Sequence, residues 1–356
     1  MAFDPLQEDC HRLILEGMRR TGSSLTDEAF FKKSMDAYRE DPSKLIVHDR
    51  DRSFHLVAKA TELCDYRIPF TQDEAAAERM AHEAEGMLRE AVSLDESNWD
   101  AQRMLCAITA PSGAAYLTYL EDNVDDVSHA LALEVAAAHD DYSREYTNDL
   151  ARRPYLRWLA ALASRSLIAG RYRKALAYAR KSLAFAPDDP ADVRYTALLA
   201  LAKLEATVPE LIEFRDQHSV AYGLASIARR RQAKNKTDAW MLLAKIAAAY
   251  HSFAYDDAER FLRELVRTYP NAAEALYCQT EFPDGLYARV NVVPFSQDEI
   301  MLALSEATPL LQEGLGAPDN ASFAYWIATN DAVVSNLKDR RLRQDAERAV
   351  YRGGEQ

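Results

Sequence analysis

The segment that decides the fold is residues 155–187, which read YLRWLAALASRSLIAGRYRKALAYARKSLAFAP. On both sides of Gly170-Arg171, apolar residues recur at the three- and four-residue spacing of an amphipathic helix. Gly170 can adopt the left-handed backbone conformation that ends many helices, and Pro187 cannot extend the second helix. The segment therefore predicts two antiparallel helices, over 155–169 and 171–185.

The second of these helices is repeated elsewhere in the chain. Its pattern is Gly170-x-Tyr172-x-x-Ala175-x-x-Tyr178-Ala179 … Pro187, and at one constant offset it aligns with Tyr255-x-x-Ala258-x-x-Phe261-Leu262 … Pro270. A third copy, without the proline, is Ala84-x-x-Met87-Leu88-x-x-Ala91-x-x-Leu94. In each copy the small alanine lets two helices approach closely, and the larger apolar side chains fill the space beside it.

With these residues the chain resembles the tetratricopeptide repeat (TPR) family, whose unit is a helix–turn–helix of about 34 residues. The resemblance is good over 155–190, fair over 238–272 and weak over 75–100, and the copies follow no uniform period. Segments 155–158 and 193–195 are similar to stretches of uncharacterised bacterial proteins of this type. The resemblance implies an all-α protein of antiparallel helix-turn-helix pairs, stacked as a TPR-like α-solenoid that is irregular at both ends. A helix bundle without repeats is the alternative.

Outside the repeats the sequence also favours helices. Only 11 Gly and 13 Pro occur in 356 residues, so few positions suit tight turns or Gly-rich loops. We predict separate helices over 112–121 and 125–139, a helix over 297–313 capped by Ser296, and an extended segment over Leu286–Phe295. The expected organisation is an N-terminal helical region (1–140), a hinge (141–153), TPR-like repeats (154–285), and an extended segment with capping helices (286–356).

Charge and cysteine usage limit the partners and the compartment. A net charge of -13 disfavours nucleic acid and anionic membranes, because both are polyanions. The four cysteines form no C-x-x-C pair, which is typical of free thiols in a reducing compartment. Residues 1–10 lack an apolar signal segment, and no stretch reaches the ~18 apolar residues of a membrane helix. We expect a cytoplasmic protein.

No motif for catalysis or metal binding is present. The sequence contains no G-x-S-x-G, G-x-x-x-x-G-K-[ST], G-x-G-x-x-G or H-E-x-x-H pattern. His48 and His55 lie near several acids, but two turns of helix would separate them. We therefore expect no catalytic residues, no metal site and no cofactor.

The resemblance does imply a binding surface, because in TPR proteins the first helix of each pair lines a groove for a peptide. Carried over to this chain, it predicts a partner-binding set of Arg157, Arg194, Trp240, Tyr250 and His251. Arginine and aromatic residues dominate the binding energy of many interfaces. For the two arginines, internal pairing with nearby acids is the alternative role.

The sequence thus favours a non-catalytic scaffold or adaptor that binds a protein or peptide, and a homodimer is one possible assembly. The alternative is a small-molecule-binding sensor or enzyme with a pocket enclosed by helices, around His48 and His55. A third hypothesis is nucleic-acid binding through two basic runs, 229–236 and 338–343. Both runs lie at expected helix ends, and no aromatic residues interleave their charges, so we expect no nucleic-acid partner.

Overall fold

The computed structural model describes residues 4–223, 237–279, 292–311 and 322–353. Within these ranges the protein is all-α, as predicted: about 20 helices make it 80% helical, and they pack largely in sequential pairs. No strand occurs in the described ranges. The chain divides into two compact units, 2–162 and 163–356, called here the N-terminal and C-terminal units.

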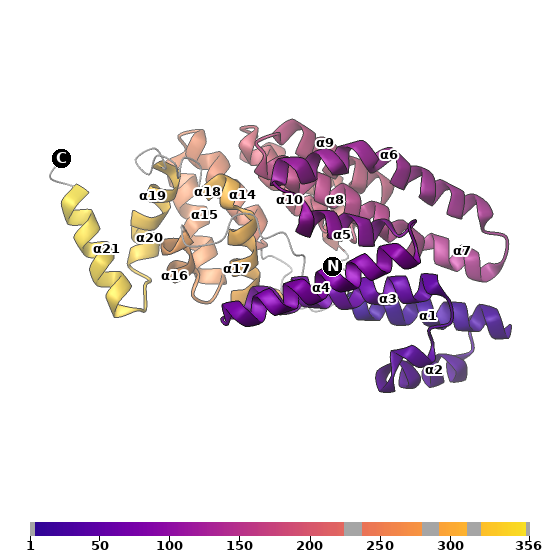
Figure 1. Cartoon of the computed structure of the whole chain (residues 1–356). Coiled ribbons are helices and arrows are strands. Elements are labelled where there is room, and N and C mark those ends of the chain that lie inside the picture. Colours follow the sequence, from indigo (N-terminus) through magenta and orange to yellow (C-terminus); the bar gives the residue numbers. More distant parts are fainter. Residues whose placement is uncertain (1–3, 224–236, 280–291, 312–321, 354–356) are drawn as a thin grey trace. The chain divides into compact units, whose positions relative to one another are not determined.

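The N-terminal unit is built around α3, which packs against both α1 and α4 (Figure 1). A π-helical turn, Glu62–Arg67, follows α3 directly. Short 3-10 turns occupy Pro42–Lys44, Ile68–Phe70 and Leu150–Arg152. The helices are α1 (Pro5–Thr21), α2 (Glu28–Glu40), α3 (Asp49–Thr61), α4 (Glu74–Leu94), α5 (Trp99–Thr109), α6 (Gly113–Ala137), α7 (Asp141–Asn148) and the first part of α8 (Arg153–Ile168).

The C-terminal unit is built around α14, which packs against α10, α15 and α17. Its helices after α8 are α9 (Tyr172–Phe185), α10 (Val193–Lys203), α11 (Val208–Gln217), α12 (Ser219–Gly223), α14 (Ala239–His251), α15 (Tyr255–Thr268), α16 (Ala272–Tyr277), α17 (Gln297–Glu306), α18 (Thr308–Leu311), α19 (Ser322–Thr329), α20 (Asp331–Val334) and α21 (Arg340–Gly353). Every residue of α14 from Ala239 to Ala249 is buried, because neighbours surround the helix on all sides.

Two predicted helices differ from the structure. The predicted break between 121 and 125 does not exist, because α6 is one continuous helix and this stretch holds polar residues but no Gly or Pro. The helix predicted over 297–313 ends at Glu306, and α18 begins just before Pro309, which lacks the N–H needed to extend α17. The Ser296 cap is confirmed, since its side chain accepts from the Glu299 amide at 3.2 Å.

The predicted extended segment and one basic run fall largely outside the described residues. Of Leu286–Phe295, residues 292–295 are described, and they form a loop and turn. Of the run 229–236, every residue lies outside the described ranges. The other run engages its own unit: the Lys338 amide donates to Glu274 Oε1 at 2.6 Å, and Arg343 Nε donates to the Leu337 carbonyl at 3.1 Å.

The repeat alanines are fully buried on helices that pack against a neighbour in the sequence. Ala175 and Ala179 of α9 are fully buried where this helix packs on α10, and Ala258 is fully buried where α15 packs on α14. In the N-terminal unit, Ala84 and Ala91 of α4 belong to the apolar cluster that this helix shares with α3. A side chain without γ atoms at these positions therefore sets how closely each pair can approach.

Four helices end in the same hydrogen-bonded turn. In each, a residue with positive φ donates its N–H to the carbonyl three residues back, and the next residue donates to the carbonyl five residues back. The positive-φ residues are Gly22 (69°), Gly170 (71°), Glu205 (62°) and Phe253 (61°). Gly170 and Phe253 stand at the same offset that relates the two repeats, so the repeated sequence forms the same turn twice.

None of the helices in the described part of the chain is both long enough and apolar enough to cross a bilayer.

The close approach at the repeat alanines can be tested by overpacking. Ala175→Leu inserts three carbon atoms at a fully buried position, and we expect it to lower the free energy of unfolding by about 1–3 kcal/mol. Ala177→Leu on the exposed face of the same helix is the matched control, with an expected change within about 0.5 kcal/mol. Urea unfolding followed by circular dichroism measures both. Equal destabilisation by the two variants would contradict the packing role.

Candidate functional site

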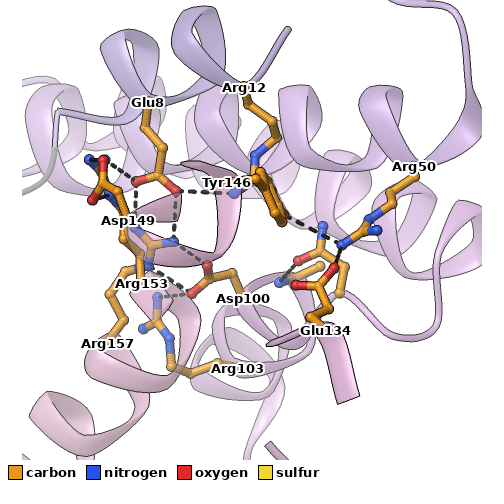
Figure 2. A network of polar contacts seen from close by, with 12 residues as sticks. Glu8, Arg12, Arg50, Asp100, Arg103, Glu134, Tyr146, Asp149, Arg153 and Arg157 are labelled. Carbon is orange, nitrogen blue, oxygen red and sulfur yellow. Dashed lines mark hydrogen bonds and ion pairs between the residues drawn. The ribbon is translucent and has the colours of Figure 1, made fainter. Parts of the chain in front are cut away.

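A network of buried charges in the N-terminal unit centres on Glu8 of α1 (Figure 2). Arg157 of α8 contacts both oxygens of this carboxylate, at 2.8 and 3.1 Å, and Arg153 contacts Oε2 at 3.1 Å. Arg12, one turn along α1, lies 3.4 Å from Oε1. Burial by itself would raise the pKa of Glu8, but Arg157, Arg12 and Arg153 outweigh it and lower the pKa to about 2.

Arg157 also pairs with a second buried carboxylate, Asp100 of α5. Its Nε donates to Asp100 Oδ1 at 2.9 Å, and its Nη2 donates to Oδ2. Burial disfavours the charged guanidinium, yet Asp100 and Glu8 raise the pKa of Arg157 further above its usual range. Arg103 of α5 approaches Asp100 Oδ1 at 3.5 Å. The structure therefore gives Arg157 the internal pairing that the sequence left open as its alternative role.

The π-helical turn brings a third carboxyl group near these arginines. Burial raises the pKa of Asp65 to about 6, and the positive charges of Arg103 and Arg157 only partly oppose this. A π-helical turn holds more residues than an α-helical turn, and such turns occur often at functional sites. Glu8 and Asp65, which both feel the charge of Arg157, thus have pKa values shifted in opposite directions, Glu8 downward and Asp65 upward.

The far side of the network is aromatic. The Arg12 guanidinium lies 3.6 Å from the ring centroid of Phe54, and it donates to the Tyr146 hydroxyl. Arg50 of α3 lies 3.4 Å from the same hydroxyl and pairs with Glu134 of α6 (Figure 2). These contacts connect α1, α3, α6 and α7, so the polar network joins helices that are distant in the sequence.

Asp9, the neighbour of Glu8, forms a separate cluster. Its Oδ2 lies 2.7 Å from His55 Nδ1 of α3 and accepts from the Tyr38 hydroxyl of α2 at 2.8 Å. Burial and the nearby Asp9 raise the pKa of Tyr38 above its usual range. His48 is not part of this cluster, because it precedes α3, and its backbone N–H donates to Asp51 Oδ2 at 3.0 Å. The two histidines of the predicted alternative site therefore have different partners.

In the C-terminal unit, Arg194 is buried between two aspartates. Its Nη1 lies 2.9 Å from Asp189 Oδ2 and 2.6 Å from Asp192 Oδ1, and 4% of its side chain is exposed. Burial raises the pKa of Asp189, and the positive charge of Arg194 partly opposes this shift. The carboxylate of Asp189 also accepts from the backbone amides of Val193 and Arg194, so it anchors the start of α10.

Trp240 extends this cluster further into the C-terminal unit. Its ring stacks on Tyr195 with centroids 4.0 Å apart and planes 15° apart, and its Nε1 donates to Glu306 of α17. Trp240 is 2% exposed. The structure therefore places both Arg194 and Trp240 in the interior, where each has an internal partner. Their contact with a partner protein stays a prediction.

Tyr250 and His251, the remaining predicted binding residues, lie in an aromatic group at the end of α14. We define the aromatic surface as Tyr250, His251, Phe253, Tyr255, Phe323 and Trp326. Tyr250 is its centre, with ring centroids 5.5 Å from Tyr255, 4.9 Å from Phe323 and 5.1 Å from Trp326. Tyr255 is 46% exposed and Phe253 is 78% exposed. The group therefore combines a half-buried central ring, Tyr250, with the exposed rings of Phe253 and Tyr255.

Phe253 holds an unusual backbone conformation for an aromatic residue. Its φ of 61° lies in the left-handed region, which costs a residue with a Cβ roughly 1–2 kcal/mol. Gly170 makes the equivalent turn without that steric cost. Because the Phe253 side chain is mostly exposed, packing within the fold offsets little of the cost.

The described residues contain no group of three or more His, Cys, Asp or Glu side chains arranged to hold a metal ion.

Comparison with known proteins identifies no relative: the sequence matches no protein-family model, and neither a curated protein nor a solved structure is significantly similar to it. The function is therefore inferred from the chemistry of the chain's own residues.

The polar network was missed by sequence reasoning, although it leaves a signal. Glu8 and Arg12 are four residues apart on α1, and Arg153 and Arg157 are four apart on α8, each pair beside buried apolar residues. Charges on the buried face of a helix need partners, so these pairs could have been matched to each other. The positive φ of Phe253 could have been predicted by extending the repeat alignment, which places Phe253 opposite Gly170.

Removing the charge of Glu8 should destabilise the N-terminal unit. Because folding lowers the pKa of Glu8 from 4.5 to about 2, its stabilisation is present above pH ~4.5 and is lost as pH falls toward 2. We expect Glu8→Gln to lower the free energy of unfolding at pH 7 by about 3 kcal/mol. Glu16→Gln, on the partly exposed side of α1, is the control and should cost about 0.5 kcal/mol or less. Urea unfolding between pH 7 and pH 3 tests this, and a Glu8→Gln deficit that does not shrink at low pH would contradict it.

Neutralising Asp65 should have the opposite effect. Folding raises the pKa of Asp65 from 3.8 to about 6, so its protonated form favours the folded state below pH ~4, and this benefit is lost as pH rises through 6. Asp65→Asn should therefore raise the free energy of unfolding at pH 8 by about 1–3 kcal/mol and have little effect at pH 4. Thermal unfolding at the two pH values measures it. Destabilisation at pH 8 would show instead that the arginines hold an ionised Asp65.

Proposed function

We propose that this protein is a non-catalytic scaffold that binds a segment of another protein through the aromatic surface. Its helix pairs form a degenerate TPR-like array, a proposal supported by the alanine-lined pairs and by the shared turn at Gly170 and Phe253. The network around Glu8 and the cluster around Arg194 have the role of holding helices together.

The observation that carries this proposal is Phe253. A glycine would satisfy the turn after α14, so the phenylalanine costs the fold stability there. Strained residues are retained where the surrounding structure or a function requires them, and this side chain makes few contacts within the fold because it is 78% exposed. Binding to a partner accounts for an exposed aromatic side chain at this position.

Other rings of the aromatic surface suit an interface. Tyr255 and Trp326 are of the residue types enriched among residues that dominate binding energy. Tyr250 packs against both rings and fixes their positions, so little conformational entropy would be lost when a partner binds. Tyr250 and His251 are the two predicted binding residues that belong to this surface.

A small-molecule sensor or enzyme is the second candidate, favoured by the opposed pKa shifts of Glu8 and Asp65. Acids with separated pKa values in one network are typical of general acid–base sites. A metabolite that raises the melting temperature of the wild type and not of Asp65→Asn would favour this candidate over the scaffold.

The scaffold proposal predicts that stability and binding respond in opposite directions to one substitution. Phe253→Gly should raise the free energy of unfolding by about 1 kcal/mol, because glycine adopts positive φ without strain. The same variant should weaken partner binding about tenfold or more, because an aromatic anchor is removed. Thermal unfolding gives the first quantity, and quantitative capture of partner proteins from lysate of the source cells gives the second.

Leu133→Ser is the matched control, since Leu133 is 57% exposed on α6 of the N-terminal unit and lies outside the aromatic surface. It should leave partner capture unchanged. If Phe253→Gly captures every protein as well as the wild type does, the aromatic surface is not the binding site.

A further inference from the structure

We infer that the partner segment presents a lysine or arginine side chain to the aromatic surface. This inference rests on the proposed scaffold function and adds the chemistry of the partner. It is drawn from the cations that lie over other aromatic rings of the protein and from the charged residues beside this surface.

Elsewhere in the protein, cations lie over aromatic rings, two of them half-buried (Phe54 and Tyr172) and one buried (Phe261). Arg12 lies over Phe54 at 3.6 Å, Lys203 over Tyr172 at 5.1 Å and Arg260 over Phe261 at 4.9 Å. The face of an aromatic ring carries partial negative charge, which attracts these cations. Within the described residues, no lysine or arginine lies over Phe253, Tyr255 or Trp326. The exposed rings of Phe253 and Tyr255 are therefore available to a cation from another molecule, whereas Trp326 stacks on Phe323.

The charges on the same segments favour a cation over an anion. Segments 250–257 and 322–331, which carry the aromatic surface, contain Asp256, Asp257 and Asp331 and no lysine or arginine. Asp257 pairs with Arg260 at 2.8 Å, whereas Asp256 is exposed in the first turn of α15. An acidic segment would meet carboxylates and negative ring faces here, and a basic segment would be attracted by both.

The occupant that fits is a peptide segment with apolar and basic side chains. Its apolar part would pack against Phe253 and Tyr255, and the lysine or arginine would lie over a ring face with its charge toward Asp256. Trp326 provides a spectroscopic reporter at this surface, because its half-buried ring lies beside Tyr250. Trp99 and Trp158 belong to the N-terminal unit, and Trp240 is buried.

The experiment is selection of random displayed peptides on the full-length protein, with the same selection on Phe253→Gly for comparison. We expect the peptides enriched on the wild type alone to carry lysine or arginine more often than the starting library does. A synthetic copy of the best peptide should change Trp326 fluorescence, and Trp326→Phe should abolish that signal. Replacing its basic residue by glutamine should weaken binding about 3- to 30-fold.

Two aspartates provide a matched pair of variants. Asp256 and Asp298 are both exposed and both the second residue of their helices, α15 and α17, so they have the same relation to the helix dipole. Asp256→Asn should weaken the basic peptide several-fold, and Asp298→Asn should not. Higher salt should weaken binding to the wild type more than to Asp256→Asn.

The outcomes separate this inference from the function on which it rests. Enriched peptides without lysine or arginine, or rich in acids, would overturn the basic partner and leave the scaffold function standing. Equal enrichment on wild type and Phe253→Gly would overturn both.

Discussion

The N-terminal unit depends on the burial of one carboxylate, Glu8, among three arginines. Removing a carboxylate from water is costly, and the attraction of Arg157, Arg153 and Arg12 offsets that cost only while all of them stay in place. The same condition applies to Arg157, which needs both Glu8 and Asp100. Each buried charge is thus stable only when its partners are correctly positioned. This constrains the geometry of the helices more strictly than apolar packing alone would.

The C-terminal unit meets an analogous constraint with different chemistry. Asp189 accepts from two amides at the start of α10 and pairs with Arg194, while Tyr195 of the same helix stacks on Trp240 of α14. The polar side fixes where α10 begins, and the aromatic side fixes how α10 meets α14. In both units, residues of the types that often bind partners serve internal pairing instead.

The spacing of apolar residues and the residues that cap or end helices were enough to predict the fold class and most helix boundaries. Both signals are local in the sequence. Gly170 ends a helix and Ser296 begins one as expected, and Ala175 and Ala258 occupy close helix contacts. The break predicted inside α6 was wrong because polarity alone does not end a helix. The burial of Arg194 and Trp240 and the pairing of Arg157 depend on residues far along the chain, which local patterns do not reveal. Tyr250 and His251 were predicted as binding residues from the repeat, whereas Trp326 packs against Tyr250 from α19, a helix that the repeat alignment does not include.

The position of Glu8 also determines when the N-terminal unit can finish folding during synthesis. Its ion pair with Arg157 spans 149 residues of sequence, so α1 leaves the ribosome long before its charge partners on α8. Contacts this distant in sequence form late, and domains fold as the chain emerges from its N-terminus. Until α8 has emerged, Glu8 must remain in water with Arg12 as its nearby cation. α1 is therefore made long before it is fixed in place, and a chain truncated before Arg153 lacks two of the three arginines that pair with Glu8.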